Sequence, residues 1–98
     1  MLLLPATLTA REARDTLHML SQSLRREPEG GVLIDASGLQ QLDSAALAVL
    51  LECQRLARAW GKAFAVRHAP PKLTALAKLY GVDELLLRDS PALAPLPA

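Results

Sequence analysis

The chain has few aromatic residues, one cysteine and almost no net charge, and each shortage argues against a class of function. Phe, Tyr and Trp occur once each, which disfavours a stacking platform for single-stranded nucleic acid. A formal charge of +1 at pH 7 gives no electrostatic reason to expect nucleic acid or an anionic membrane as the main ligand. One cysteine cannot form an internal disulfide or a multi-cysteine metal site, which fits a reducing, cytoplasmic location.

Long apolar runs are also missing. The N-terminal run Leu2–Leu4 stops at Pro5 without a basic segment before it, so we expect this run to be neither a membrane span nor a secretion signal. What the chain has in abundance is hydrophobic residues, with 22 Leu and 17 Ala but only five Val or Ile, a balance that favours helices. At 98 residues it holds one core, and we expect one domain over residues 1–89 and a Pro-rich tail over 90–98.

Hydrophobic periodicity predicts strands that alternate with helices. We expect strands over residues 2–8, 32–34 and 63–67, helices over 9–26, 43–60 and 71–80, and a short helical turn over 82–87. Pro5 makes the first strand an irregular edge strand, the strand over 32–34 should be buried on both faces, and 35–42 should form a loop. Strands separated by full-length helices indicate an α/β fold with helices packed against the sheet.

Local signals mark the ends of the predicted helices. Thr9 and Glu12 have the spacing of a capping box, which would start the first helix at Thr9. The stop signals are Pro28, Gly30 and Gly31 after the first helix, Gly61 after the second, and Gly81 after the third, which Pro71 opens.

The junction between the second strand and the second helix carries the strongest functional signal, because Asp43-Ser44 presents a hydroxyl at a helix N-terminus. A helical wheel places Ala46, Val49, Leu50, Cys53, Leu56, Ala57 and Trp60 on an arc that should face the sheet. The opposite arc holds Ser44, Leu47, Ala48, Leu51, Arg55 and Arg58. Because this arc is apolar in its first two turns, we expect Leu47 and Leu51 to face a partner protein, unless neighbouring loops cover them.

The position of Ser44 alone allows a helix cap, a phosphorylation site or a hydroxyl that hydrogen-bonds across an interface. Asp35 and Asp43 have no third group to complete an acid–base site, and loop or cap hydrogen bonds explain them more simply. The remaining candidates, His18, His68 and Cys53, lack the spacing of metal ligands or of a nucleophile–base pair. We therefore expect no catalytic residue, no metal and no cofactor.

Two segments resemble a known family. Asp43-Ser44-Ala45-Ala46-Leu47, after the strand Val32–Asp35, resembles the helix-two signature of STAS domains, and Leu76–Val82 is similar to the third helix of the MlaB-like members. The resemblance runs from about Leu3 to Leu87. It implies a STAS-like (SpoIIAA-like) α/β domain with a small mixed sheet, acting as a non-enzymatic binding module.

The resemblance also implies partners. In MlaB-like proteins the Ser44 position faces the MlaF-like ATPase subunit of the MlaFEDB phospholipid ABC transporter, which maintains outer-membrane lipid asymmetry, so the chain would be cytoplasmic and peripheral at the inner membrane. In anti-sigma factor antagonists, the alternative, a kinase-like anti-sigma factor phosphorylates this hydroxyl. The implied interface comprises Asp43, Ser44, Ala45, Leu47, Ala48, Leu51, Arg55, Leu76, Lys78 and Tyr80.

Two features of the sequence depart from the family pattern and affect how far the family's interface can be assigned to this chain. Ala46 stands where the family commonly has Gly, which affects how closely another backbone can approach. The chain also begins close to its first strand, so the extra N-terminal strand of STAS domains is expected to be missing, leaving a sheet edge that can self-associate.

Overall fold

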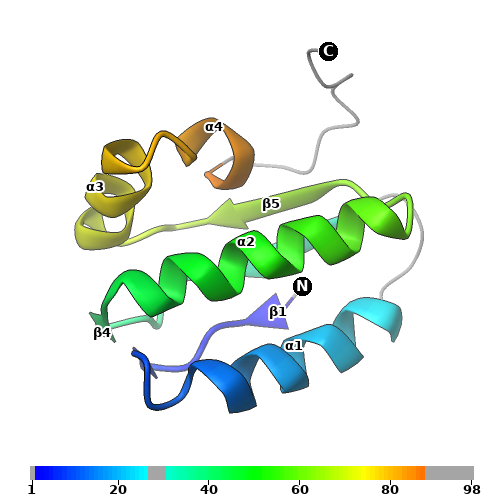
Figure 1. Ribbon diagram of the computed structural model, residues 1–98, viewed down its shortest axis with the longest axis horizontal. Helices are drawn as coiled ribbons and strands as arrows, with labels where there is room; N and C mark the ends of the chain where they lie inside the picture. The colour runs from blue at the N-terminus through cyan, green and yellow to red at the C-terminus, as the bar shows by residue number, and fades with distance from the viewer. Residues whose placement is uncertain (1, 27–30, 88–98) are drawn as a thin grey trace.

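Two small sheets organise the fold, which we describe from a computed structural model over residues 2–26 and 31–87 (Figure 1). The main sheet has the order β1-β3-β5, with β1 at Leu2–Leu3, β3 at Val32–Asp35 and β5 at Phe64–Arg67. The second sheet joins β2, Thr7–Leu8, to β4, Gln41–Leu42. All of these strand pairs are parallel. The α/β fold is therefore confirmed, but the described pairs are uniformly parallel rather than mixed.

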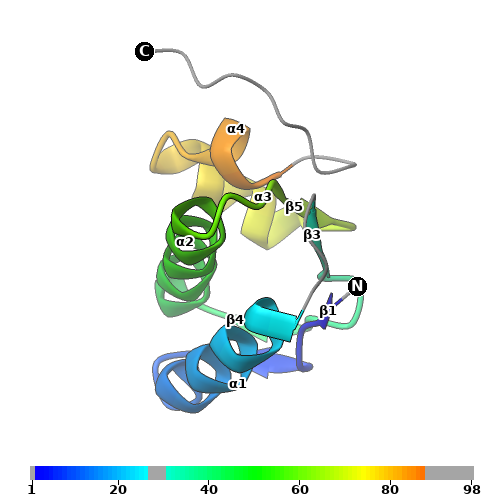
Figure 2. The same cartoon turned by 90° about the vertical axis from the view of Figure 1, so that its right-hand side faces the viewer.

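The helices lie together on one side of the main sheet (Figure 2). They are α1 (Ala13–Arg26), α2 (Ser44–Ala59), α3 (Pro71–Leu79) and α4 (Asp83–Leu86). α2 runs between α1 on one flank and α3 with α4 on the other, and it packs against all three (Figure 1). No helix in the described ranges is both long and apolar enough to span a membrane.

Two expectations about the strands were wrong. Residues 35–42 are not all loop, because Asp35 ends β3 and Gln41–Leu42 forms β4. β4 pairs through the register Leu8↔Leu42, and both of these leucines are buried. β3 is not buried on both faces, since Val32 and Ile34 are fully buried whereas Leu33 and Asp35 are only half-buried. The physical reason is that the helices cover a single face of the sheet (Figure 2).

The first helix begins four residues later than expected, at Ala13. The Glu12 carboxylate accepts hydrogen bonds from the Thr9 backbone N–H (2.9 Å) and from the Thr9 hydroxyl (2.6 Å). The hydroxyl therefore donates to Glu12 instead of accepting from a helical N–H, and this pair closes a turn that precedes α1. α1 ends at Arg26, and Pro28, Gly30 and the tail over 90–98 lie outside the described residues.

The other helix boundaries follow the predicted signals. Pro71 is the first residue of α3, and both Gly61 and Gly81 adopt φ of +72° just after α2 and α3. That left-handed backbone is accessible to glycine at little cost. The predicted edge position of the first strand is also confirmed, because β1 flanks the main sheet and Pro5 separates it from β2.

Candidate functional site

The start of α2 is held by Asp43. Its carboxylate accepts the Ala45 N–H (2.8 Å) through one oxygen and the Ala10 N–H (3.2 Å) through the other. Asp43 is therefore the N-cap of α2, and it also ties this helix to the turn before α1. The carboxylate lies at the positive end of the helix dipole, where a negative charge is stabilised.

Ser44 is the first residue of α2 and is exposed. Because Asp43 performs the capping, the interpretation of Ser44 as the cap is wrong. Within the described part of the chain, the Ser44 hydroxyl has no hydrogen-bond partner. The site thus offers a free hydroxyl at the tip of a helix, available to hydrogen-bond with another molecule or to be phosphorylated.

Leu47 does not face outward, contrary to the wheel prediction. Its side chain is 3% exposed and belongs to the main core, and Leu51 is half-buried and packed against the same core. The wheel assumed that α2 buries only its sheet-facing arc. In the fold, α1 and α3 flank this helix, so its buried arc is wider than half its circumference (Figure 1).

The exposed strip of α2 is consequently small and polar. It consists of Ser44, Ala48, Arg55, Arg58 and Ala59. Arg55 forms an ion pair with Glu52 on the same helix, with its Nε 2.8 Å from the Glu52 carboxylate. The hydrogen bond from Arg55 lowers the pKa of Glu52, so this pair stays ionised and compensated on the surface.

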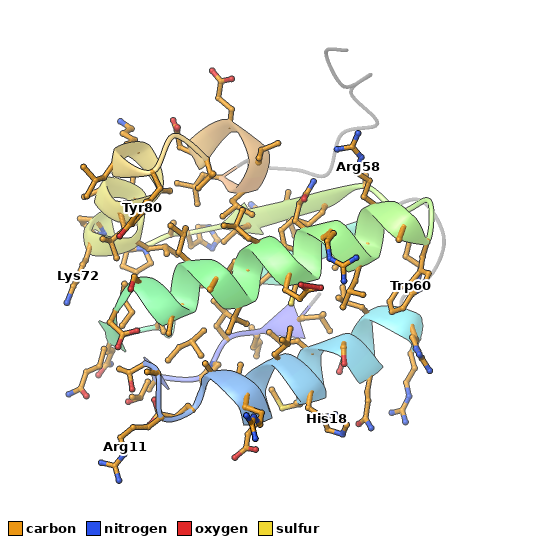
Figure 3. All side chains as sticks on the ribbon, viewed as in Figure 1. Arg11, His18, Arg58, Trp60, Lys72 and Tyr80 are labelled. Atoms are coloured by element: carbon orange, nitrogen blue, oxygen red, sulfur yellow. The ribbon has the colours of Figure 1, made fainter. Side chains whose placement is uncertain are left out.

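Several exposed apolar groups lie at α3 and α4, next to this strip; the others are Leu3 of β1, Met19 of α1 and Trp60 after α2. At the end of α3, Leu79 is 76% exposed and Tyr80 is 58% exposed, and Leu85 of α4 is partly exposed. Lys78 is also exposed, whereas Leu76 is half-buried against the core. In Figure 3, α3 with its labelled Tyr80 and Lys72 stands beside the N-terminal half of α2.

The sequence did not point to Leu79 or Leu85, because the family resemblance implied Leu76, Lys78 and Tyr80 as the interface residues of this helix. A helical wheel of α3 contains the signal for Leu79. The residues that α3 buries are Leu73 and Ala77, and Leu79 projects well away from both at 100° per residue. The structure therefore moves the apolar part of the candidate surface from α2 to the end of α3.

Asp35 and Asp43 do not form a carboxylate pair, because each has its own partners. Asp35 accepts the Ser37 N–H (2.8 Å) and lies 3.3 Å from Nδ1 of His68. The hydrogen bond from Ser37, with a smaller contribution from His68, lowers the pKa of Asp35. Across the described residues, no group of three or more His, Cys, Asp or Glu side chains could hold a metal ion.

Neither Cys53 nor His18 has, among residues 2–26 and 31–87, a partner that would make it a nucleophile or a general base. Burial raises the pKa of the Cys53 thiol to about 12, so the thiolate needed for nucleophilic attack is disfavoured. Cys53 is fully buried in the core, as expected from its arc. His18 is exposed on α1, with Nε2 3.3 Å from the Gln22 amide.

Comparison with known proteins gives a family and a fold. The family model described as Mlab, STAS domain matches residues 2–88. Among solved structures, the chain is similar to an anti-sigma-factor antagonist (STAS) domain protein from Planctomyces limnophilus, with a TM-score of 0.75 and 19% identity. That match covers 92% of this chain and 80% of the other. A search of curated proteins finds no match.

Proposed function

This chain belongs to the MlaB-type STAS domain family, and on that premise we propose that it is a non-enzymatic binding module that docks on the ATPase subunit of a phospholipid-transporting ABC complex. The family match over residues 2–88 and the MlaB-like segment Leu76–Val82 support the transporter assignment. In this role the chain supports assembly or activity of an MlaFEDB-like complex and stays at the cytoplasmic face of the inner membrane. It needs no contact with lipid.

The observation that carries the proposal is the pair of exposed apolar side chains at the end of α3. Leu79, the last residue of α3, is 76% exposed, and Tyr80, the C-cap of that helix, is 58% exposed; α3 packs beside α2. Burying them against a partner removes apolar area from water, and Tyr is among the residues that most often dominate binding energy.

The α2 strip completes the proposed surface. Ser44 contributes a hydroxyl, Ala48 allows close approach of a partner helix, and Arg55 contributes a charged rim.

The remaining predicted interface residues lie beneath or beside the proposed surface. Leu47, Leu51 and Leu76 pack below the surface, Asp43 and Ala45 hold the helix start through their hydrogen bond, and Lys78 adds a second cationic rim. The partner surface should therefore offer an apolar pocket with acidic residues around it.

Co-purification with the ATPase tests this assignment. Ala48→Glu and the double variant L79S/Y80A should each weaken binding at least about tenfold, because each removes or blocks a central contact. Met19→Ser is the matched control, since Met19 is exposed on α1, which lies on the opposite flank of α2 from α3 (Figure 1). Leu47→Asp is unsuitable because it would place a charge in the core. Wild-type binding by both surface variants would refute the interface.

A second function is favoured by the free hydroxyl of Ser44, namely an anti-sigma factor antagonist switched by phosphorylation. A phosphate on Ser44 would be stabilised by the dipole of α2 but repelled by the neighbouring Asp43 carboxylate. Mass spectrometry after incubation with a kinase-like anti-sigma factor discriminates the two functions. Phosphate on Ser44, absent from a Ser44→Ala control, supports the switch, and its persistent absence supports the transporter role.

A further inference from the structure

The C-terminal ends of α1 and α2 form a second exposed surface, at a distance from α3. The two helices pack side by side and run in the same direction, so their last turns lie at the same end of the molecule (Figure 1). We call this surface the basic end, and it consists of Arg25, Arg26, Arg58, Trp60 and Lys62. Tyr80 of the candidate docking surface lies at the opposite end of α2 (Figure 3).

The basic end is held together by contacts of Trp60 and Lys62. The Trp60 ring centroid lies 5.6 Å from the guanidinium carbon of Arg25 and 5.9 Å from Nζ of Lys62. Lys62 also donates to the Leu24 carbonyl oxygen at 2.6 Å, which ties the segment after α2 to the last turn of α1. Trp60 nevertheless remains 37% exposed. Because cation–π contacts fix the ring relative to the cations, the surface is arranged before any ligand binds.

The positive charge of the basic end exceeds what the helices need. Two helix C-termini carry together roughly one negative charge, which basic residues in the last turns compensate. The basic end has four cationic side chains, and the described segments 20–26 and 56–64 contain no acidic residue. Glu27 and Glu29 follow in the sequence and lie outside the described residues, and a positive surplus remains with both counted. Within residues 2–26 and 31–87, none of the three arginines of the basic end forms an ion pair.

We propose that the basic end binds an acidic, extended segment of a partner protein. Arginine pairs with carboxylates through two parallel hydrogen bonds, and Trp and Arg are enriched among the residues that dominate protein interfaces. Side chains on one side of an extended chain repeat about every 7 Å, and packed helix axes lie about 8–10 Å apart. Acidic residues at alternate positions can therefore reach cations on both helices. In Figure 3, Trp60 projects toward α1 and Arg58 away from it, so the segment crosses the end of α2.

A protein segment fits this surface better than an anionic membrane does. Polybasic membrane sites combine about four to eight Lys or Arg with apolar side chains that insert between the lipids. Trp60 is the one large apolar side chain of the basic end, and its ring already contacts Arg25 and Lys62. The basic end therefore lacks a group that could anchor it in a bilayer, whereas its arginines remain available to carboxylates.

Binding of a model peptide to the full chain tests the site. The probe is a fluorescein-labelled peptide in which glutamate alternates with serine, and its counterpart has glutamine in place of glutamate. Wild type should bind the glutamate peptide at least about tenfold more tightly, because glutamine offers arginine no charged partner. The unlabelled glutamate peptide should change the fluorescence of Trp60, the one tryptophan of the sequence. Equal affinities for the two peptides would overturn the proposal.

Variants of α1 locate the binding. R25Q/R26Q should weaken binding of the glutamate peptide at least about fivefold, because it removes two cations of the basic end. R11Q/R14Q is the matched control, since it removes the same charge from exposed arginines near the start of α1, and it should change the affinity less than about twofold. Circular dichroism verifies that both variants are folded. Equal losses in both variants would show that binding follows net charge alone and would overturn the site.

Two further measurements separate the basic end from the other surface and from lipid. The proposal does not depend on the ATPase assignment, so Ala48→Glu, which blocks the candidate docking surface, should bind the glutamate peptide within about twofold of wild type. A larger loss would place the peptide on that other surface and refute the basic end. Vesicles containing phosphatidylglycerol should not displace the peptide. Displacement that R25Q/R26Q abolishes would assign the basic end to anionic lipid instead.

Discussion

Among single residues, Asp43 makes the largest local contribution to the geometry of the site. Its two oxygens satisfy N–H groups from two segments, Ala45 in α2 and Ala10 before α1. Asp43→Ala should therefore lower the free energy of unfolding by about 1–2 kcal/mol, the upper part of the range for loss of an N-cap. Urea denaturation measures this change. Asp43→Asn keeps an acceptor oxygen for Ala45 and should lose less than half as much; equal losses would show that the charge matters more than the cap.

The carboxylate of Glu12 gives a pH-dependent effect at the same scale. Its pKa is lowered, chiefly by the hydrogen bond from the Thr9 side chain and then by the Thr9 N–H. A carboxyl group whose pKa falls on folding stabilises the protein above its unfolded pKa, about 4.3, and that stabilisation disappears as pH falls through the folded value. Glu12→Gln should thus be less stable than wild type at pH 6 and equally stable near pH 2. Melting curves at both values test this, and a difference that persists in acid would contradict it.

At the level of helices, the two faces of α2 and α3 decide which leucines support the fold and which remain available for binding. Leu47 lies in the core, so Leu47→Ala should cost about 2–5 kcal/mol of stability. Leu79 is largely exposed, so Leu79→Ala should change stability by no more than about 0.5 kcal/mol. Chemical denaturation of both variants compares them directly. Similar losses would mean that Leu79 packs more closely than its exposure indicates.

The same comparison shows what the sequence could predict at this scale. Gly61, Gly81 and Pro71 act through their own backbone, so local pattern located the corresponding helix ends. The position of Leu47 depends on helices packed on both flanks of α2, which a wheel of one helix cannot represent. β2 and β4 have two residues each, too few for an alternating pattern to emerge.

For the whole molecule, the fold class and family followed from the order of elements and from two short motifs. The family match over residues 2–88 confirmed the family, and the structure with its match to a STAS domain at a TM-score of 0.75 confirmed the fold class. The location of the proposed binding surface could not be predicted in the same way, because it depends on which apolar side chains remain exposed after the core is filled. Leu47 and Leu51 were absorbed by the core, and Leu79 and Tyr80 were left exposed.

The single core also predicts how the molecule unfolds. Side chains from α1, α2, β3 and α3 join one cluster, represented by Leu24, Leu50, Ile34 and Leu73. Elements that share a core lose their packing together, so unfolding should be a single cooperative transition. Trp60, the one tryptophan of the sequence, is exposed at the C-cap of α2, outside this core, and reports on the α1–α2 end of the fold.

Trp60 is suited to this measurement because it caps α2 and contacts α1. Its ring centroid lies 5.6 Å from the Arg25 guanidinium and 5.9 Å from the Lys62 ammonium, and Lys62 also donates to the Leu24 carbonyl at 2.6 Å. Trp60 fluorescence and far-UV circular dichroism should give the same urea midpoint. Leu73→Ala, which alters only α3, should lower both midpoints equally, with a loss of about 2–5 kcal/mol. If it lowered the dichroism midpoint alone, α3 would unfold independently of the α1–α2 pair.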